Sequence, residues 1–357
     1  MKRSFINLAF SLLLISCSSS DPNNNTTPPP SGGNNGGNAS QWLIPINEVK
    51  DGGPGKDGIP SIDNPKFITA NETTFLADDD LVVGIHVNGE ARAYPHDILD
   101  WHEVTNDDIN GESLTINYCP LTGTAFSWKS EVNGTKSTFG VSGLLYNSNL
   151  ILYDRNTDSN WSQLKLECVN GPLISKTPTL VKVIETTWNR WKTLYPNTKV
   201  LDVNTGFSRN YGQYPYGEYK TNHGFFLFQP AIFNNALPNK ERVHAIISGD
   251  KSKVYRFSDF SGGKTIIDVF NGSSYLIVGN DDLICSFVLP EAYEDLTFEH
   301  KQNTTDGALF EDNEGNRWSA FGEVISGPRL GEKLTASKSV ISFWFAIAAF
   351  YPNPDIY

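Results

Sequence analysis

The stretch NYCPLTGT, residues 117–124, lies where an alternating pattern of apolar and polar residues stops. Leu114, Ile116 and Tyr118 alternate with polar neighbours, which predicts a strand, and the following proline and glycine predict a turn. A cysteine at such a break stands at the end of an element, where side chains can face a cleft. We therefore expect Cys119 to lie at the rim of a cleft.

Polar residues gather on both sides of this stretch. His102 and Glu103 precede it, and the segments Tyr153–Arg155 and Trp161–Gln163 follow it. Cys119 is either a thiolate that acts as nucleophile or metal ligand, or a small buried residue. His102 is either a ligand or general base with Glu103 beside it, or a structural histidine.

The N-terminus has the layout of a secretory signal over residues 1–16, with Lys2 and Arg3 before an apolar run that is too short to span a bilayer. The segment Leu14–Cys17 resembles the bacterial lipobox, which implies that Cys17 is lipidated and anchors the chain to a membrane. Ser18 after that cysteine favours the outer membrane by the same resemblance. Residues 17–41 are then a flexible tether rich in Ser, Asn, Pro and Gly.

Composition excludes one class of partner. The chain of 357 residues has a formal net charge of −12 at pH 7, so it lacks the basic surface that binds phosphates, and we expect no nucleic-acid partner. Lipidation of Cys17 would leave three of the four cysteines, an odd number in a compartment that permits disulfides. At least one is therefore free, metal-bound or oxidised, and Cys119 is our candidate.

The chain resembles itself at long range. Asn110-Gly111, Phe126, Trp161 and Trp188 have counterparts in the same order, which are Asn271-Gly272, Phe287, Trp318 and Trp344. Such an ordered series predicts a tandem duplication. Each copy consists of short strands with Gly-containing turns and closes with one helix, expected from the spacing of Ile184, Trp188, Trp191 and Tyr195 and from the apolar run 340–351.

These boundaries give three parts after the tether: a first β subdomain over residues 42–201, an aromatic-rich connecting loop over 202–240, and a second, degenerate β subdomain over 241–357. A loop of that length is either a lid or binding loop, or a strap packed across the two copies. None of the polar candidates is kept in the second copy, where Asn280 stands for Cys119, Gly263 for His102 and Asp312 for Arg155. The candidate site therefore belongs to the first copy.

With these residues in hand, the chain resembles the bacterial domain of unknown function 3179 (DUF3179) family. The segments that carry the resemblance are DGIPSIDNPKF (57–67), RAYP (92–95), LDWHE (99–103), YCPLTGT (118–124), FGVSGLLY (139–146), YDR (153–155) and WSQ (161–163). Some members have a second cysteine where this chain has Thr122, so a Cys-x-x-Cys redox couple is not available here. The family's name implies no function.

We expect a mainly β fold with a few helices, built from two tandem homologous β subdomains that are each closed by a C-terminal helix. The candidate catalytic residues are Cys119, His102 and Glu103, and the candidate ligand-binding residues are Arg92, Asp154, Arg155, Trp161 and Gln163. Asp154 and Arg155 either clamp an anionic group or form an internal ion pair.

Three functions remain open at this point. The first is a binding or assembly module of the cell envelope with a protein or small-molecule partner. The second is a copper or zinc protein that binds its metal through Cys119 and His102, and the third is an enzyme with a cysteine nucleophile.

Overall fold

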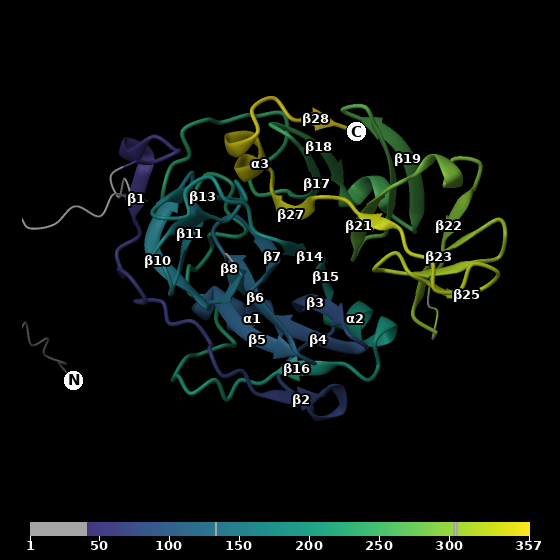
Figure 1. The fold of residues 1–357 in the computed structure, drawn as a ribbon, viewed down its shortest axis with the longest axis horizontal. Coiled ribbons are helices and arrows are strands. Elements are labelled where there is room, and N and C mark those ends of the chain that lie inside the picture. The colour runs from purple at the N-terminus through teal and green to yellow at the C-terminus, as the bar shows by residue number, and fades with distance from the viewer. Residues whose placement is uncertain (1–40, 133, 303, 305) are drawn as a thin grey trace, which may run out of the picture. The chain divides into compact units, whose positions relative to one another are not determined.

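The computed structural model describes residues 41–357 except 133, 303 and 305. Within these residues the chain is mainly β, with three short α-helices, as predicted (Figure 1). The helices are α1 (His96–His102), α2 (Trp188–Leu194) and α3 (Trp344–Phe350). The signal sequence, Cys17 and nearly the whole tether lie outside the described residues.

Residues 42–201 form three larger sheets and a small β-hairpin. The first sheet, in the order β15-β3-β4-β16-β2, contains β2 (Phe67–Thr69), β3 (Leu81–Val87), β4 (Glu90–Pro95), β15 (Ile184–Thr187) and β16 (Lys199–Leu201). The second, in the order β14-β7-β6-β5, contains β5 (Val104–Ile109), β6 (Glu112–Cys119), β7 (Thr124–Lys129) and β14 (Leu180–Val181). The third, in the order β1-β10-β11-β12-β13, contains β1 (Val49–Asp51), β10 (Phe139–Tyr146), β11 (Asn149–Asp154), β12 (Asn160–Ser162) and β13 (Glu167–Asn170). The hairpin is β8 (Glu131–Val132) with β9 (Thr135–Lys136).

Residues 241–357 form three further sheets, whose strands are drawn in green and yellow in Figure 1. The first, in the order β27-β17-β18-β28, contains β17 (Arg242–Ser248), β18 (Lys251–Arg256), β27 (Ser339–Phe343) and β28 (Asp355–Ile356). The second, in the order β19-β20-β21-β26, contains β19 (Lys264–Phe270), β20 (Ser273–Gly279), β21 (Ile284–Val288) and β26 (Thr335–Ala336). The third, in the order β22-β23-β24-β25, contains β22 (Phe298–His300), β23 (Ala308–Asp312), β24 (Arg317–Ser319) and β25 (Val324–Ser326). Four short 3₁₀ helices complete the described elements: η1 (Ile46–Glu48), η2 (Ala70–Glu72), η3 (Phe257–Phe260) and η4 (Glu291–Tyr293).

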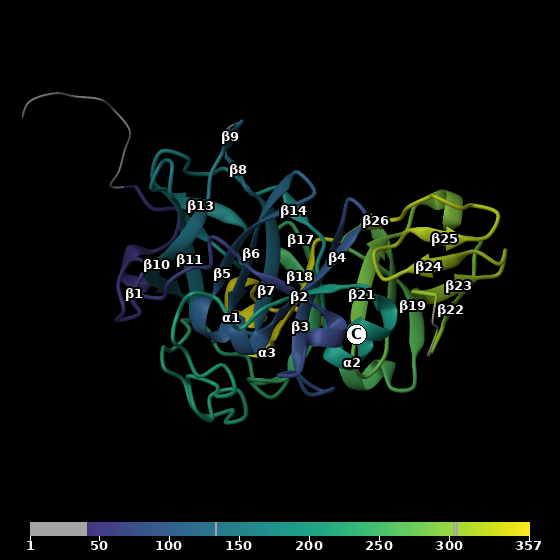
Figure 2. The same cartoon turned by 90° about the horizontal axis from the view of Figure 1, so that it is seen from below.

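The Asn-Gly pairs make hairpin turns as the sequence predicts. In both Asn110-Gly111 and Asn271-Gly272 the two residues have positive φ, of 49° and 87° in the first pair and 47° and 79° in the second. This backbone is the one that two-residue hairpin turns of type I′ require, and Asn and Gly adopt it at low cost. The turns join β5 to β6 and β19 to β20, and both β6 and β20 are inner strands of their sheets. Strand β6 lies between β5 and β7 (Figure 2).

The closing helices begin later than the apolar spacing predicts. Ile184 lies in β15, which pairs with β3, and only at Trp188 does α2 begin. The run 340–351 likewise starts as β27, paired with β17, before α3 begins at Trp344. Apolar residues at a spacing of four are compatible with a buried strand that continues into a helix, so periodicity does not locate the boundary. No helix among the described residues has the length and apolar character needed to cross a membrane.

One buried core contains residues of both subdomains. Cys119 and Phe126 of the first pack in the same cluster as Val243 and Phe343 of the second. The two β subdomains are therefore not separated by a solvated linker, and removing either would expose apolar side chains of the other.

The connecting segment 202–240 contains no helix or strand, but it is held firmly. Several of its aromatic side chains pack against the same core, namely Tyr214, Tyr216, Phe225, Phe226 and Phe228. Lys240, which is 4% exposed, donates from Nζ to the carbonyl oxygens of Tyr219 at 2.6 Å and Phe225 at 2.7 Å. The ammonium thus holds together backbone of a segment that has no secondary structure of its own.

Candidate functional site

A cavity of about 320 Å³ lies where five separate parts of the chain meet. The N-terminal segment lines the cavity with Gly52, Pro54, Gly58 and Ile59, and the end of α1 lines it with Asp100, Trp101 and the following Glu103. Leu121 comes from the turn after β6, and Gly143 and Leu145 come from strand β10. The connecting segment adds Arg209, Pro215, Tyr216 and Phe228. Its walls are thus largely apolar and aromatic, and its carboxyl groups both come from the region of α1.

Glu103 stands at the C-terminal cap of α1. Its amide donates to the carbonyl of Leu99 at 2.8 Å, and its carbonyl accepts from the amide of Tyr118 at 2.7 Å. Its φ of 58° lies in the left-handed region that a helix end often requires, which is usually occupied by glycine. A glutamate at this position bears a conformational cost of order 1 kcal/mol or more, so this backbone strain is a feature of the cavity wall.

The Glu103 side chain is buried without a partner. It is 5% exposed, and within the described residues its carboxyl group makes no hydrogen bond or ion pair. Burial raises the pKa of Glu103 to about 8, and the nearby negative charge of Asp100 adds to the shift. At neutral pH this carboxyl is therefore mostly protonated, an uncommon state for a glutamate.

One carboxyl oxygen of Asp100 accepts a hydrogen bond and the other, within the described chain, does not. Its Oδ2 accepts from Lys220 Nζ at 2.8 Å, and that ammonium also lies 4.1 Å from the ring centroid of Tyr214. Its Oδ1 is buried and has no hydrogen-bond partner within the described chain. Burial raises the pKa of Asp100 although Lys220 and His96 oppose the shift. Two carboxyl groups therefore border the cavity, and Lys220 is bound to one of them, Asp100.

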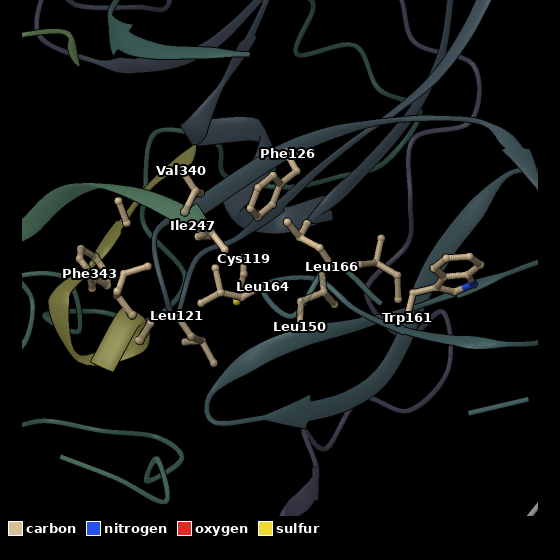
Figure 3. Close-up of a cluster of buried hydrophobic side chains, with 14 of the residues drawn as sticks. Cys119, Leu121, Phe126, Leu150, Trp161, Leu164, Leu166, Ile247, Val340 and Phe343 are labelled. Atoms are coloured by element: carbon tan, nitrogen blue, oxygen red, sulfur yellow. The ribbon is translucent and has the colours of Figure 1, made fainter. Parts of the chain in front are cut away.

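Cys119 does not line the cavity, so our expectation that its thiol stands at the rim is wrong. It is 1% exposed and packs among Leu121, Phe126, Leu150 and Leu164 (Figure 3). Burial, and after it the charge of Glu103, raise the pKa of the Cys119 thiol to about 11. The end of β6 is covered by residues from distant strands, which the local sequence did not reveal.

His102 is also fully buried and does not line the cavity. Its Nδ1 lies 2.7 Å from the carbonyl oxygen of Pro60 and its Nε2 lies 2.7 Å from the Tyr211 hydroxyl. Because the carbonyl only accepts, Nδ1 carries the proton and donates, and Nε2 accepts from the tyrosine. Burial lowers the pKa of His102, in keeping with a neutral ring. Both nitrogens are thus used in joining α1 to the N-terminal and connecting segments.

A metal site finds no support in this geometry. Across the described residues, no three His, Cys, Asp or Glu side chains lie close enough to hold one ion. The proposed pair of Cys119 and His102 therefore lacks a third ligand of these types within residues 41–357, the three undescribed positions aside.

Gln163 is at the centre of a buried polar network around the turn after β6. Its Nε2 donates to Asn117 Oδ1 at 2.9 Å, and its Oε1 accepts from Thr124 Oγ1 at 2.6 Å and from Asn149 Nδ2 at 2.7 Å. Thr122 Oγ1 accepts from the same Asn149 amide at 2.9 Å. Each of these groups is satisfied internally, which supports a structural role for this part of the motif.

The remaining candidates are also engaged inside the protein. The Arg155 guanidinium reaches Asp63 at 3.0 Å and the Ser61 hydroxyl at 2.9 Å, so it fastens the N-terminal segment to β11. Asp154 accepts from Trp161 Nε1 at 3.0 Å.

Arg92 follows the same pattern. Its guanidinium donates to Glu90 Oε1 at 2.6 Å and to Asp107 at 2.5 Å, and it lies over the ring of Phe67. These contacts occupy the Arg92 guanidinium within the protein.

Of the residues expected to form a site, only Glu103 lines the cavity. Sequence reasoning did not select Asp100, Lys220 or Tyr216. Asp100 stands three residues before Glu103, a spacing that places both on one side of a helix end, and this signal was available. Lys220 and Tyr216 lie in the connecting segment, whose aromatic residues suggested a binding loop without indicating what it covers.

Comparison with known proteins gives one match. The model of a family described as "Protein of unknown function (DUF3179)" matches residues 56–354. No curated protein and no solved structure matches the chain.

Proposed function

The chain belongs to the DUF3179 family, whose function is unknown, and from this premise we propose that it is a binding module whose cavity beside Glu103 takes a small ligand. The observation that carries the proposal is the combination of apolar walls with a buried, unpartnered carboxyl group. Small-molecule sites usually have this composition, in which a few polar groups orient a ligand held by apolar surface.

Binding is favoured over cysteine catalysis by the state of the candidate nucleophile. A thiol with a pKa of about 11 is almost entirely protonated at neutral pH, and the His102 nitrogens are hydrogen-bonded to Pro60 and Tyr211. A cysteine nucleophile needs a base that takes its proton or a group that lowers its pKa. Hydrogen bonds with Thr122 and Leu150 lower the pKa of Cys119, but burial outweighs them, and the His102 nitrogens are already occupied.

The proposal includes a location. We propose an outer-membrane lipoprotein of the bacterial cell envelope, anchored through Cys17, whose tether leaves the binding module free beside the membrane. The support is the signal-like layout of residues 1–16 and the lipobox-like segment Leu14–Cys17. Metabolic labelling with a radioactive fatty acid tests it: label should enter the parent and be absent from Cys17→Ala, and equal labelling would contradict the anchor.

The proposal also includes an origin by tandem duplication. It is supported by two sheets with corresponding orders, β15-β3-β4-β16 and β27-β17-β18-β28, in which β16 and β28 are the parallel members. It is further supported by a shared contact, because Asp312 accepts from Trp318 Nε1 at 2.9 Å as Asp154 does from Trp161. By this contact Asp312 corresponds to Asp154 and not to Arg155. In this proposal the second copy has kept the scaffold, and its described residues contribute no carboxyl group to the cavity.

The experiment for the binding function uses a small apolar probe and a cavity-filling variant. We expect 2-phenylethanol to bind the parent in ligand-observed NMR and to bind Ile59→Trp at least tenfold more weakly, because the indole occupies part of the cavity. Ile267→Trp is the matched control, since Ile267 is 49% exposed on β19 and distant in sequence from every lining residue. Equal binding of 2-phenylethanol to all three proteins, or a parent that binds neither 2-phenylethanol nor 2-phenylethylamine, would refute the function.

A further inference from the structure

Resting on that proposed function, we propose that the ligand of this cavity carries a primary ammonium group on an apolar body, and that the carboxyl groups of Asp100 and Glu103 bind the ammonium. The inference specifies the chemical class of the ligand. It rests on which hydrogen-bonding capacity the cavity leaves unused and on what its walls are made of.

The unused hydrogen-bonding capacity of the cavity consists of carboxyl oxygens, which accept hydrogen bonds. Asp100 is 3% exposed, and its Oδ1 has no donor within the described residues. Glu103 is 5% exposed, and its carboxyl group has neither a hydrogen bond nor an ion pair there. Asp100 Oδ1 is fully buried, and such an acceptor without a donor costs about 1–3 kcal/mol, and more where it is charged, so a ligand that brings an N–H donor to it gains what the free protein lacks.

The charges of the protein leave room for a cation. Lys220 is bound to Asp100 Oδ2 at 2.8 Å and lies over the Tyr214 ring, so its ammonium is already placed. Arg209 borders the cavity but is exposed and forms no ion pair with Asp100 or Glu103 in the described structure. Lys220 therefore offsets the charge of Asp100 alone. Glu103 is mostly protonated in the free protein, and an ammonium beside it favours its ionised form, so the three N–H donors of the ligand meet both a charge and free oxygens.

The walls favour an organic cation over a bare inorganic one. Leu121, Leu145 and Phe228 provide apolar surface, and Trp101 and Tyr216 add aromatic rings. Rings of this kind attract a cation that lies over their faces, and the apolar surface is removed from water only by a ligand with a hydrocarbon part. A metal ion would use none of this surface, and within the described residues no three metal-ligating side chains come together.

The test compares two probes that share one apolar body. 2-Phenylethylamine is a cation at neutral pH, and 2-phenylethanol is its neutral counterpart. We expect the full-length parent protein to bind the amine at least about tenfold more tightly than the alcohol, the ratio that one charge-assisted hydrogen bond supplies. In Asp100→Asn and in Glu103→Gln this ratio of amine affinity to alcohol affinity should fall to about threefold or less.

Loss of binding in these variants must be distinguished from loss of folding. Glutamine has nearly the size of the glutamate it replaces, and the Glu103 side chain has no hydrogen-bond partner to lose among the described residues, so Glu103→Gln should fold. Thermal unfolding identifies any variant that has lost its fold. Asp79→Asn, at an exposed position, is the control and should keep the parent ratio. A parent that binds the alcohol as tightly as the amine, or a ratio unchanged in both variants, would overturn the ammonium inference and leave the binding function standing. Failure of both probes to bind the parent would overturn both proposals.

Discussion

Replacing Glu103 by glutamine should make the protein more stable at neutral pH, because it removes a carboxyl group that the fold keeps protonated. The pKa of Glu103 is raised to about 8 from a usual value of 4.5, chiefly by burial. Below pH 4.5 the group holds its proton in both the folded and the unfolded chain. Between pH 4.5 and 8 the unfolded chain releases that proton and the folded chain retains it, so the free energy of unfolding falls as pH rises.

The size of the effect follows from the shift. Each unit of pKa difference corresponds to about 1.4 kcal/mol, so this single group should lower stability by about 3 kcal/mol between pH 4.5 and pH 7. Above pH 8 both states are ionised and the loss should level off. Glutamine has no proton to lose in this range, so the Glu103→Gln variant should lack this component.

Urea unfolding at pH 4.5, 5.5, 6.5 and 7.5 measures the difference between the parent and Glu103→Gln, in which the contributions of all other titrating groups largely cancel. The difference should change by about 3 kcal/mol over this range in favour of the variant. Glu131→Gln, at an exposed position on β8, is the matched control and should follow the parent at every pH. Parallel pH profiles for the parent and Glu103→Gln would refute a protonated, unpartnered Glu103.

Three further outcomes can be measured. Gln163→Ala should lower the free energy of unfolding by about 1–3 kcal/mol in urea, because it leaves the Asn149 amide without one of its acceptors; a loss below about 0.5 kcal/mol would contradict the network. Arg155→Ala should speed amide exchange and limited proteolysis in the segment around Asp63, and unchanged protection there would show that the ion pair does not fasten it. Iodoacetamide at pH 8 should leave Cys119 unmodified in the folded protein and alkylate it in urea, since burial raises its pKa to about 11; labelling of the native thiol would contradict its position in the core.

Local sequence rules located much of the secondary structure. The Asn-Gly pairs predicted two-residue turns correctly, because few other residues adopt two successive positive φ values at low cost. Alternation around Ile116 predicted β6 correctly, and the mainly β composition of the fold followed from many such short segments. These signals are local: each depends on residues within one turn or one strand.

By itself, then, the sequence determined the fold class, the turns and the neighbourhood of the site, since Glu103 was among the candidates and lines the cavity. Only the tertiary structure decided the role of each side chain there. Cys119 is covered by Leu150 and Leu164 from other strands, and His102 is taken up by Tyr211, more than a hundred residues away in sequence. Burial, desolvation and hydrogen-bond satisfaction depend on which distant segments come together, and no local pattern contains that information.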